Sequence, residues 1–187
     1  MNAITSTDLL TRIDRLEARA AIAELVGSYG VACDDRDMAR LGALFTEDAS
    51  FSSRDGVMRA KGVPAILEMY RGRFRVLGPS YHWTHDHFVR FDAENADRAT
   101  GTVLGHAECW RNGEALIGAM RYEDVYRRDG GVWRFASREL AFFYYVPVTE
   151  YAEALGSRFR QRAYGDQRPA DYPETLATWT TWETVPA

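Results

Sequence analysis

Three long segments with the alternating pattern of β-strands follow one another in the second half of the chain. They cover about residues 99–110, 115–127 and 132–146. The residues between them, Asn112-Gly113 and Asp129-Gly130-Gly131, are typical of the tight turns of β-hairpins. Strands joined by turns this short must pair antiparallel. We therefore expect an antiparallel meander in this half of the chain.

Helices are expected before the meander. Apolar residues recur at steps of three and four over residues 9–16 and 22–33, and over the shorter segment 38–45. Residues 62–77 form a further predicted helix, and a short hairpin is expected over residues 49–61. Helices followed by a meander predict an α+β fold, in which the helices pack on one face of a curved sheet.

Composition excludes several classes of function. The chain has 187 residues, of which 46% are hydrophobic, so it is long enough for one domain with a core. Its net charge of −4 argues against a nucleic-acid partner. Lys61 is the single lysine, which nearly excludes Schiff-base chemistry, and Cys33 and Cys109 are too few for a disulfide framework. Residues 1–5 lack a signal-peptide pattern and no apolar run spans a bilayer, so we expect a cytoplasmic protein without a membrane partner.

Three of the four histidines, His82, His85 and His87, fall within six residues of one predicted strand. On a regular strand, His85 and His87 share a face with Tyr81 and Trp83, while His82 points the other way. An apolar face favours the neutral imidazole that a general base requires. Two alternatives are core histidines bonded to the backbone and a metal-binding His-x-His pair. No further ligands follow at a suitable spacing, so we expect no metal.

Other polar residues have both a functional and a structural interpretation. Asp34 either orients a histidine or ends a helix, and Tyr29 either polarises a carbonyl or packs as an aromatic ring. Arg138 lies within an apolar strand and needs a partner there. That partner is either an internal carboxylate or an anion in a pocket. Glu108 and Asp124 on the neighbouring strands are similar cases, with solvated edge positions as the alternative.

Several ordered motifs together resemble one known family. They lie in residues 12–22, in Asp34-Asp35-Arg36-Asp37, in residues 44–49 and in residues 122–135. Over residues 8–148 the chain resembles the SnoaL-like branch of the NTF2-like superfamily. Its motifs are most similar to those of hexachlorocyclohexane dehydrochlorinase, and more distantly to those of scytalone dehydratase and bile-acid dehydratase.

The resemblance implies a fold and a set of site residues. The fold is a cone, in which a strongly curved antiparallel sheet wraps around helices and encloses an apolar pocket. The family's catalytic aspartate falls on Asp34 and its arginine on Arg138. The histidine falls on His85, with His87 as the second choice, and Tyr29 is nearest to a tyrosine of scytalone dehydratase.

These residues imply a cofactor-independent lyase that uses histidine–aspartate acid–base catalysis on a hydrophobic, aromatic small molecule. The leaving group is water, halide or formaldehyde. The alternatives are an isomerase or polyketide cyclase with the same pocket, and a non-catalytic ligand-binding module. Four aromatic residues are expected to bind the substrate, namely Tyr81, Trp83, Phe142 and Tyr144.

We expect residues 1–148 to form the single domain, and residues 149–187 to form a C-terminal extension on that domain or on a neighbouring subunit. A helix is expected over residues 150–161. The family resemblance also implies a homo-oligomer, a dimer or a trimer, that assembles through the outer face of the sheet.

Overall fold

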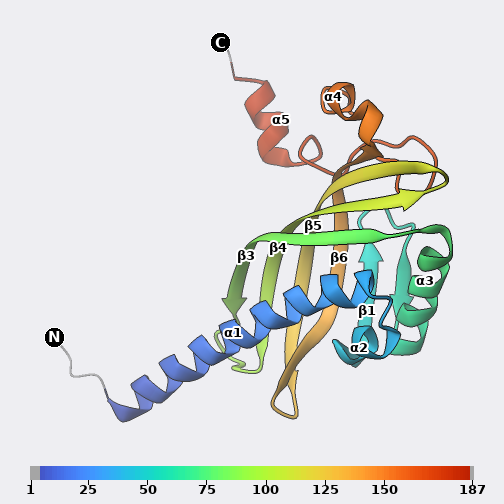
Figure 1. The fold of residues 1–187 in the computed structure, drawn as a ribbon. Coiled ribbons are helices and arrows are strands. Elements are labelled where there is room, and N and C mark those ends of the chain that lie inside the picture. Colours follow the sequence, from blue (N-terminus) through green and yellow to red (C-terminus); the bar gives the residue numbers. More distant parts are fainter. Residues whose placement is uncertain (1–4, 186–187) are drawn as a thin grey trace.

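The computed structural model describes residues 5–185, in which the helices that precede the meander lie on the concave side of one curved six-stranded sheet (Figure 1). The signal-peptide expectation concerns a segment whose residues 1–4 lie outside the described part. The elements in chain order are α1 (Ser6–Asp34), α2 (Met38–Ala43), β1 (Phe45–Ser53), β2 (Arg59–Lys61), α3 (Val63–Val76), β3 (Ser80–Phe91), β4 (Arg98–Arg111), β5 (Glu114–Asp129), β6 (Val132–Pro147), the 3-10 helix η1 (Val148–Glu150), α4 (Tyr151–Ala154) and α5 (Ala177–Glu183).

Among the described residues, no helix combines the length and the hydropathy needed to cross a bilayer.

The sheet has the strand order β2-β1-β6-β5-β4-β3. Strands β3 to β6 form the antiparallel meander, and β1 joins it by pairing parallel to β6. Asn112, Gly113, Gly130 and Gly131 in the two tight turns all have positive φ, as type I′-like hairpin turns require. The expected α+β architecture is confirmed.

Helix α1 is one long helix that contains both predicted apolar segments. Thr5 caps it, because its side chain accepts a hydrogen bond from the backbone N–H of Asp8 while the Asp8 carboxylate accepts one from the Thr5 N–H. The buried face of its C-terminal half, which includes Ile22, Val26 and Tyr29, lies against the concave side of the sheet. Its N-terminal half projects beyond the sheet (Figure 1).

Strand β3 is irregular in its middle. Thr84 pairs with Gly105 and His87 pairs with Val103, so that His85 and Asp86 stand opposite a single residue of β4. This arrangement is a β-bulge, which interrupts the alternation of side chains along a strand.

The bulge changes which histidines point inwards. His82, before the bulge, lies against α1, and His87, after it, bonds to the inward-facing Tyr126. His85 points to the outer face, where it meets His106. The prediction that His85 and His87 share a face is therefore wrong, because the alternation on which it rests stops between them.

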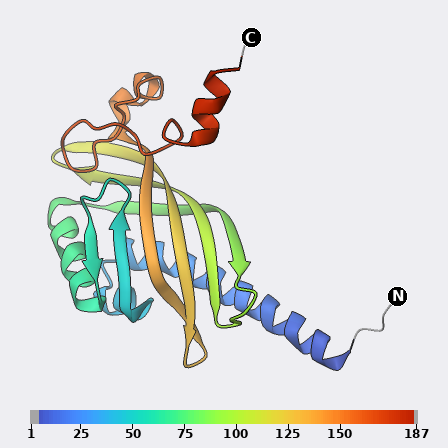
Figure 2. The same cartoon turned by 180° about the vertical axis from the view of Figure 1, so that it is seen from behind.

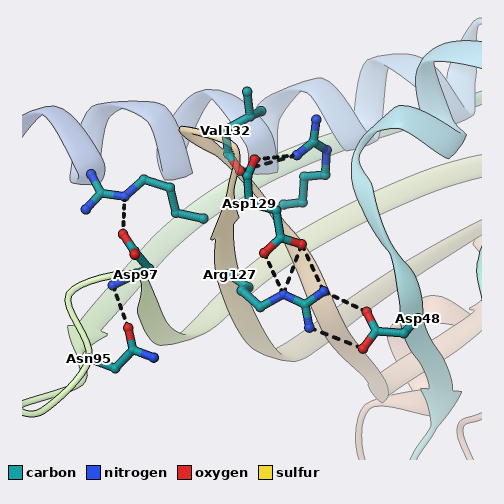
Figure 3. A network of polar contacts seen from close by, with 8 residues as sticks. Asp48, Asn95, Asp97, Arg127, Asp129 and Val132 are labelled. Carbon is teal, nitrogen blue, oxygen red and sulfur yellow. Dashed lines mark hydrogen bonds and ion pairs between the residues drawn. The ribbon is translucent and has the colours of Figure 1, made fainter.

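Charged residues form a network of ion pairs near the turn between β5 and β6, as Figure 3 shows. The guanidinium of Arg127 donates to Asp129 and to Asp48 of β1, with the nearest Arg127–Asp48 contact at 2.7 Å. Hydrogen bonding to Arg127 lowers the pKa of Asp48 to about 2. Arg128 next to it donates to Asp97 and also reaches Asp14 on α1, so the hairpin is bound to both the sheet and the helix.

The chain after β6 crosses the other end of the sheet (Figure 2). The predicted helix over residues 150–161 is limited to α4, which ends before Gly156, and irregular chain follows. This segment is held by Arg160, which is buried and donates to the Phe143 carbonyl and to Glu174. Arg111 of β4 donates in turn to the Ala163 carbonyl at 2.6 Å.

Candidate active site

A carboxylate–imidazole pair lies where the C-terminal end of α1 meets β3. Asp34 Oδ1 is 2.6 Å from His82 Nδ1, and Asp34 Oδ2 accepts the backbone N–H of His82 at 2.8 Å. Ser80 donates its hydroxyl to the same carboxylate at 3.1 Å. The helix approaches closely because Gly30 has no side chain, and a Cβ there would lie 3.2 Å from the Cβ of His82. The pair is thus fixed by both backbone and side-chain contacts.

The surroundings of Asp34 keep it ionised. Partial burial raises its pKa, but hydrogen bonds from His82 and Ser80 outweigh this effect and lower the pKa below its usual value. An ionised Asp34 accepts a hydrogen bond from the Nδ1–H group of His82, which fixes the imidazole in one tautomer. The other nitrogen, Nε2, is then free to accept a proton, as a general base requires.

His82 lines an apolar cavity of about 80 Å³ between α1, α3 and the sheet. The wall consists mainly of aromatic, methionine and leucine side chains. Its lining residues are Tyr29, Cys33, Phe51, Met58, Met69, Tyr70, Arg73, Phe74, Leu77, Ser80, His82 and Leu140. On its other side His82 borders a smaller cavity of about 10 Å³, which Tyr29 and Arg138 also line.

Arg138 supplies a buried positive charge at this smaller cavity. Its Nε and Nη2 each lie 2.8 Å from an oxygen of Asp124, and the two side chains are 1% and 0% exposed. The rings of Tyr29, Tyr122 and Phe135 surround the guanidinium at 4.1–4.2 Å. Nη1 is buried and has no hydrogen-bond partner among residues 5–185. The site therefore contains one unused cationic donor.

Two tyrosines line the cavity of about 80 Å³. Tyr29 of α1 and Tyr70 of α3 are hydrogen-bonded to each other through their hydroxyls. Burial raises the pKa of both well above the usual value, so both stay protonated, and one of them donates to the other. Burial likewise raises the pKa of the Cys33 thiol to about 12, which argues against this cysteine as a nucleophile.

His87 is connected to Arg138 through a chain of hydrogen bonds. Its Nε2 lies 3.1 Å from the hydroxyl of Tyr126, which donates to Asp124 at 2.8 Å. Burial is the largest influence on His87 and lowers its pKa below the usual value. The structure therefore places this predicted residue inside the sheet, linked through Tyr126 to the Asp124–Arg138 pair.

This arrangement predicts a loss of stability on mild acidification. With a lowered pKa in the native state, His87 binds fewer protons than its unfolded counterpart, which titrates near about 6.5. Its contribution to stability is complete above that value and declines as the pH falls towards the native pKa. The pKa of His106 is lowered in the same direction by burial and by His85.

Urea unfolding at a series of pH values measures this decline. We expect His87→Gln to make the free energy of unfolding less dependent on pH as the pH falls below about 6.5. An unchanged pH dependence in this variant would contradict the prediction.

Several predicted site residues lie away from the cavity. His85 Nε2 is 2.7 Å from His106 Nδ1, and His106 Nε2 is 2.9 Å from the Tyr144 hydroxyl, all on the outer face of the sheet. Tyr81 and Trp83 are 55% and 47% exposed on that face. The expected pairing of Asp34 with His85 is not found, because His85 lies on the outer face with Tyr81 and Trp83, opposite to the face of His82.

The four aromatic residues expected to bind substrate therefore divide into two groups. Tyr81 and Trp83 on β3 alternate with His82 and therefore point outwards. Tyr144 on β6 points outwards as well, because it lies in register with Trp83 through Ala119 and His106. Phe142 is buried in the core beside Tyr145, and its backbone N–H donates to Asp171. None of the four lines the cavity of about 80 Å³.

The sequence reasoning missed His82, although it brought Asp34, Tyr29 and Arg138 to one place. One signal points to the irregularity, namely the run of polar residues from Thr84 to His87 within a strand. Such a run does not fit a strand that alternates regularly between a core and an outer face. It does not reveal on which side of the bulge the inward-facing histidine lies.

Comparison with known proteins supports the relation expected from the motifs. The family model described as a SnoaL-like domain matches residues 14–139. The gamma-hexachlorocyclohexane dehydrochlorinase of Sphingobium indicum is 28% identical over 143 residues, which is 74% of this chain and 89% of that protein. Hexachlorocyclohexane dehydrochlorinase 1 of Sphingobium indicum is also 28% identical, over 145 residues, 74% of this chain and 90% of that protein.

Solved structures agree in fold. A hexachlorocyclohexane dehydrochlorinase (LinA) type 2 has a TM-score of 0.69 at 24% identity, over 73% of this chain and 93% of that one. A scytalone dehydratase-like protein of Novosphingobium aromaticivorans has a TM-score of 0.66 at 22% identity, over 72% and 90% of the two chains. Since the matching family model spans most of the sheet and its helices, the chain belongs to the SnoaL-like family.

Proposed function

We propose that this protein is a cofactor-independent lyase in which His82 is the general base. One observation carries the proposal. His82, whose Nδ1 is bonded to Asp34 and whose Nε2 has no hydrogen-bond partner among residues 5–185, lines an apolar cavity, and Arg138, whose buried Nη1 has no partner among these residues, lines the adjoining one. The imidazole of His82 is the base, and Arg138 supplies a cationic donor at a cavity that His82 also lines. This combination fits a reaction in which a proton and an anion leave one substrate.

The proposed step is an elimination. Nε2 of His82 takes a proton from a substrate carbon, and the electrons of that C–H bond form a C=C bond while a halide or hydroxide leaves the neighbouring carbon. If formaldehyde leaves instead, the base takes the proton of a hydroxymethyl O–H, the C–O bond becomes C=O, and the C–C bond breaks with its electrons left on the substrate carbon, which then takes the proton back from His82. Asp34 stabilises the imidazolium, and Arg138 with Tyr29 stabilises the negative charge.

The cavity favours a hydrophobic substrate. Its wall is mainly aromatic and aliphatic, and Met58 and Met69 are flexible side chains that adjust to the shape of a ligand. An aromatic ring packs favourably against Phe51, Tyr70 and Phe74. The similarity to dehydrochlorinases, which are lyases, supports the reaction class, while the substrate and the leaving group are part of the proposal.

To test this proposal, the purified full chain is assayed with three compounds that share one aromatic skeleton. They carry a halide, a hydroxyl or a hydroxymethyl group at the same position. Released halide, the dehydrated product and formaldehyde are measured separately, with and without a chelator. We expect turnover of one form and no effect of the chelator. An isomerised product that keeps every substituent would favour the isomerase or cyclase alternative. Binding without turnover, unchanged in Asp34→Asn, would favour a ligand-binding module.

A further inference from the structure

A stripe of apolar and small residues runs along the face of α1 that points away from the sheet. We call it the α1 seam, and it consists of Leu9, Ile13, Leu16, Ala20, Ala23 and Gly27. All six are exposed, and Leu9, Ile13 and Leu16 are 51%, 42% and 67% exposed. The buried residues of α1, such as Ile22 and Val26, lie on the opposite face, so the seam takes no part in the core of this chain.

The spacing of the seam is that of a coiled coil. Successive members are separated alternately by four and three residues, which are the steps between the a and d positions of a heptad. The seam extends for about 27 Å at the rise of an α-helix. Figure 1 shows its N-terminal part projecting beyond the sheet, where nothing from the described chain covers it. Large apolar side chains exposed in such a row are typical of an interaction surface.

Gly27 is the second observation. It lies within α1, where glycine is destabilising relative to alanine, yet a Cβ built there meets nothing within 4 Å. The interior of this chain therefore does not require a glycine at that position. Together with Ala20 and Ala23 it makes one half of the seam small, which permits the close approach of a second helix backbone.

The charges beside the seam indicate the partner and its direction. Arg12 and Arg19 occupy the g positions, and Glu17 and Glu24 occupy the e positions. In a parallel pair of identical helices, g residues face e residues of the partner five positions later. Arg12 then faces the partner's Glu17, and Arg19 faces the partner's Glu24. An antiparallel pair brings like charges together instead.

These charged groups are available for such contacts. Arg12, Glu17 and Glu24 form no salt bridge with any residue from 5 to 185. Arg19 donates to the Val89 carbonyl through Nη1, which leaves its other nitrogens for a second acceptor.

We propose that a second copy of this chain docks along the α1 seam, with the two helices parallel and related by a two-fold axis. The sheets then lie on the two outer sides of the helix pair, because each seam faces away from its own sheet. This contact differs from the outer-face association that the family resemblance implies, and it neither requires nor blocks that association.

Two neighbouring alanines test the proposal. Ala20 lies on the seam, and Ala21 is exposed but off it. We expect Ala20→Glu to halve the mass of the full chain in sedimentation equilibrium, and we expect Ala21→Glu to leave the mass unchanged. A monomeric wild-type protein would overturn the proposal, as would an Ala20→Glu variant with the mass of the wild type.

Orientation is tested by a cysteine at Leu16. In a parallel pair the two Leu16 positions face each other, so Leu16→Cys is expected to form a disulfide-linked dimer on oxidation. Cys33 and Cys109 are buried and do not compete. Arg12→Glu is expected to weaken the dimer, and the exchange Arg12→Glu with Glu17→Arg to restore it. Failure of both the cross-link and the restoration would reject the parallel arrangement.

Discussion

Replacing His82 by alanine is expected to lower kcat/KM by about 10²- to 10⁴-fold, the range that general-base catalysis supplies. The variant loses the imidazole that Asp34 orients, but it keeps the backbone hydrogen bond from residue 82 to the carboxylate. The fold is expected to persist, because the side chain is 25% exposed and lies beside a cavity. The rate is measured with the compound that is turned over among the three that carry a halide, a hydroxyl or a hydroxymethyl group.

His85 provides a matched control for this experiment. It is also a histidine of β3, but it bonds to His106 on the outer face of the sheet. His85→Ala is therefore expected to retain nearly the full rate. A rate that falls in His85→Ala and persists in His82→Ala would show that the assignment of the base to His82 is wrong.

Replacing Arg138 by leucine is expected to reduce the free energy of unfolding by about 3–5 kcal/mol. The change leaves the Asp124 carboxylate fully buried without its cation, although Tyr126 still donates to it. It also removes the guanidinium around which Tyr29, Tyr122 and Phe135 pack. Urea unfolding followed by circular dichroism measures the loss.

The double variant Arg138→Leu with Asp124→Leu separates the charge from the packing. Removing both members of a buried ion pair leaves no unpaired charge, so the double variant is expected to be more stable than Arg138→Leu alone. Arg138→Lys keeps the charge but lacks the planar fork that binds both oxygens of Asp124. If Arg138→Leu unfolds at the same urea concentration as the wild type, the pair does not stabilise the fold.

The architecture was predictable because each part of it depends on neighbours in the sequence. Asn112-Gly113 and Asp129-Gly130-Gly131 define the two tight turns, and the alternation of apolar residues marks the strands between them. The periodicity of α1 shows which side of the helix is buried. The parallel pairing of β1 with β6 was not predicted, because it joins strands far apart in the sequence and no turn specifies it.

The site was predictable only in part. Asp34, at a helix end, lies against His82, and Arg138, within a regular strand, lines the cavity that His82 borders. The sequence does not indicate that His82 is the histidine at this place, because the choice among three histidines depends on which face of the strand each side chain occupies, and the bulge at His85-Asp86 interrupts the alternation. Bulges arise from pairing with the neighbouring strand, so the pattern of one strand does not locate them.

The bulge in β3 also affects how sequences of related chains should be compared. Before it, even-numbered residues such as His82 face the cavity, and after it odd-numbered residues such as His87 face the interior. A chain with one residue fewer between positions 84 and 87 would have regular alternation with both halves of the strand facing as they do here, but every residue after the deletion would be numbered one lower. An alignment without a gap in this segment therefore matches residues that lie on opposite sides of the sheet.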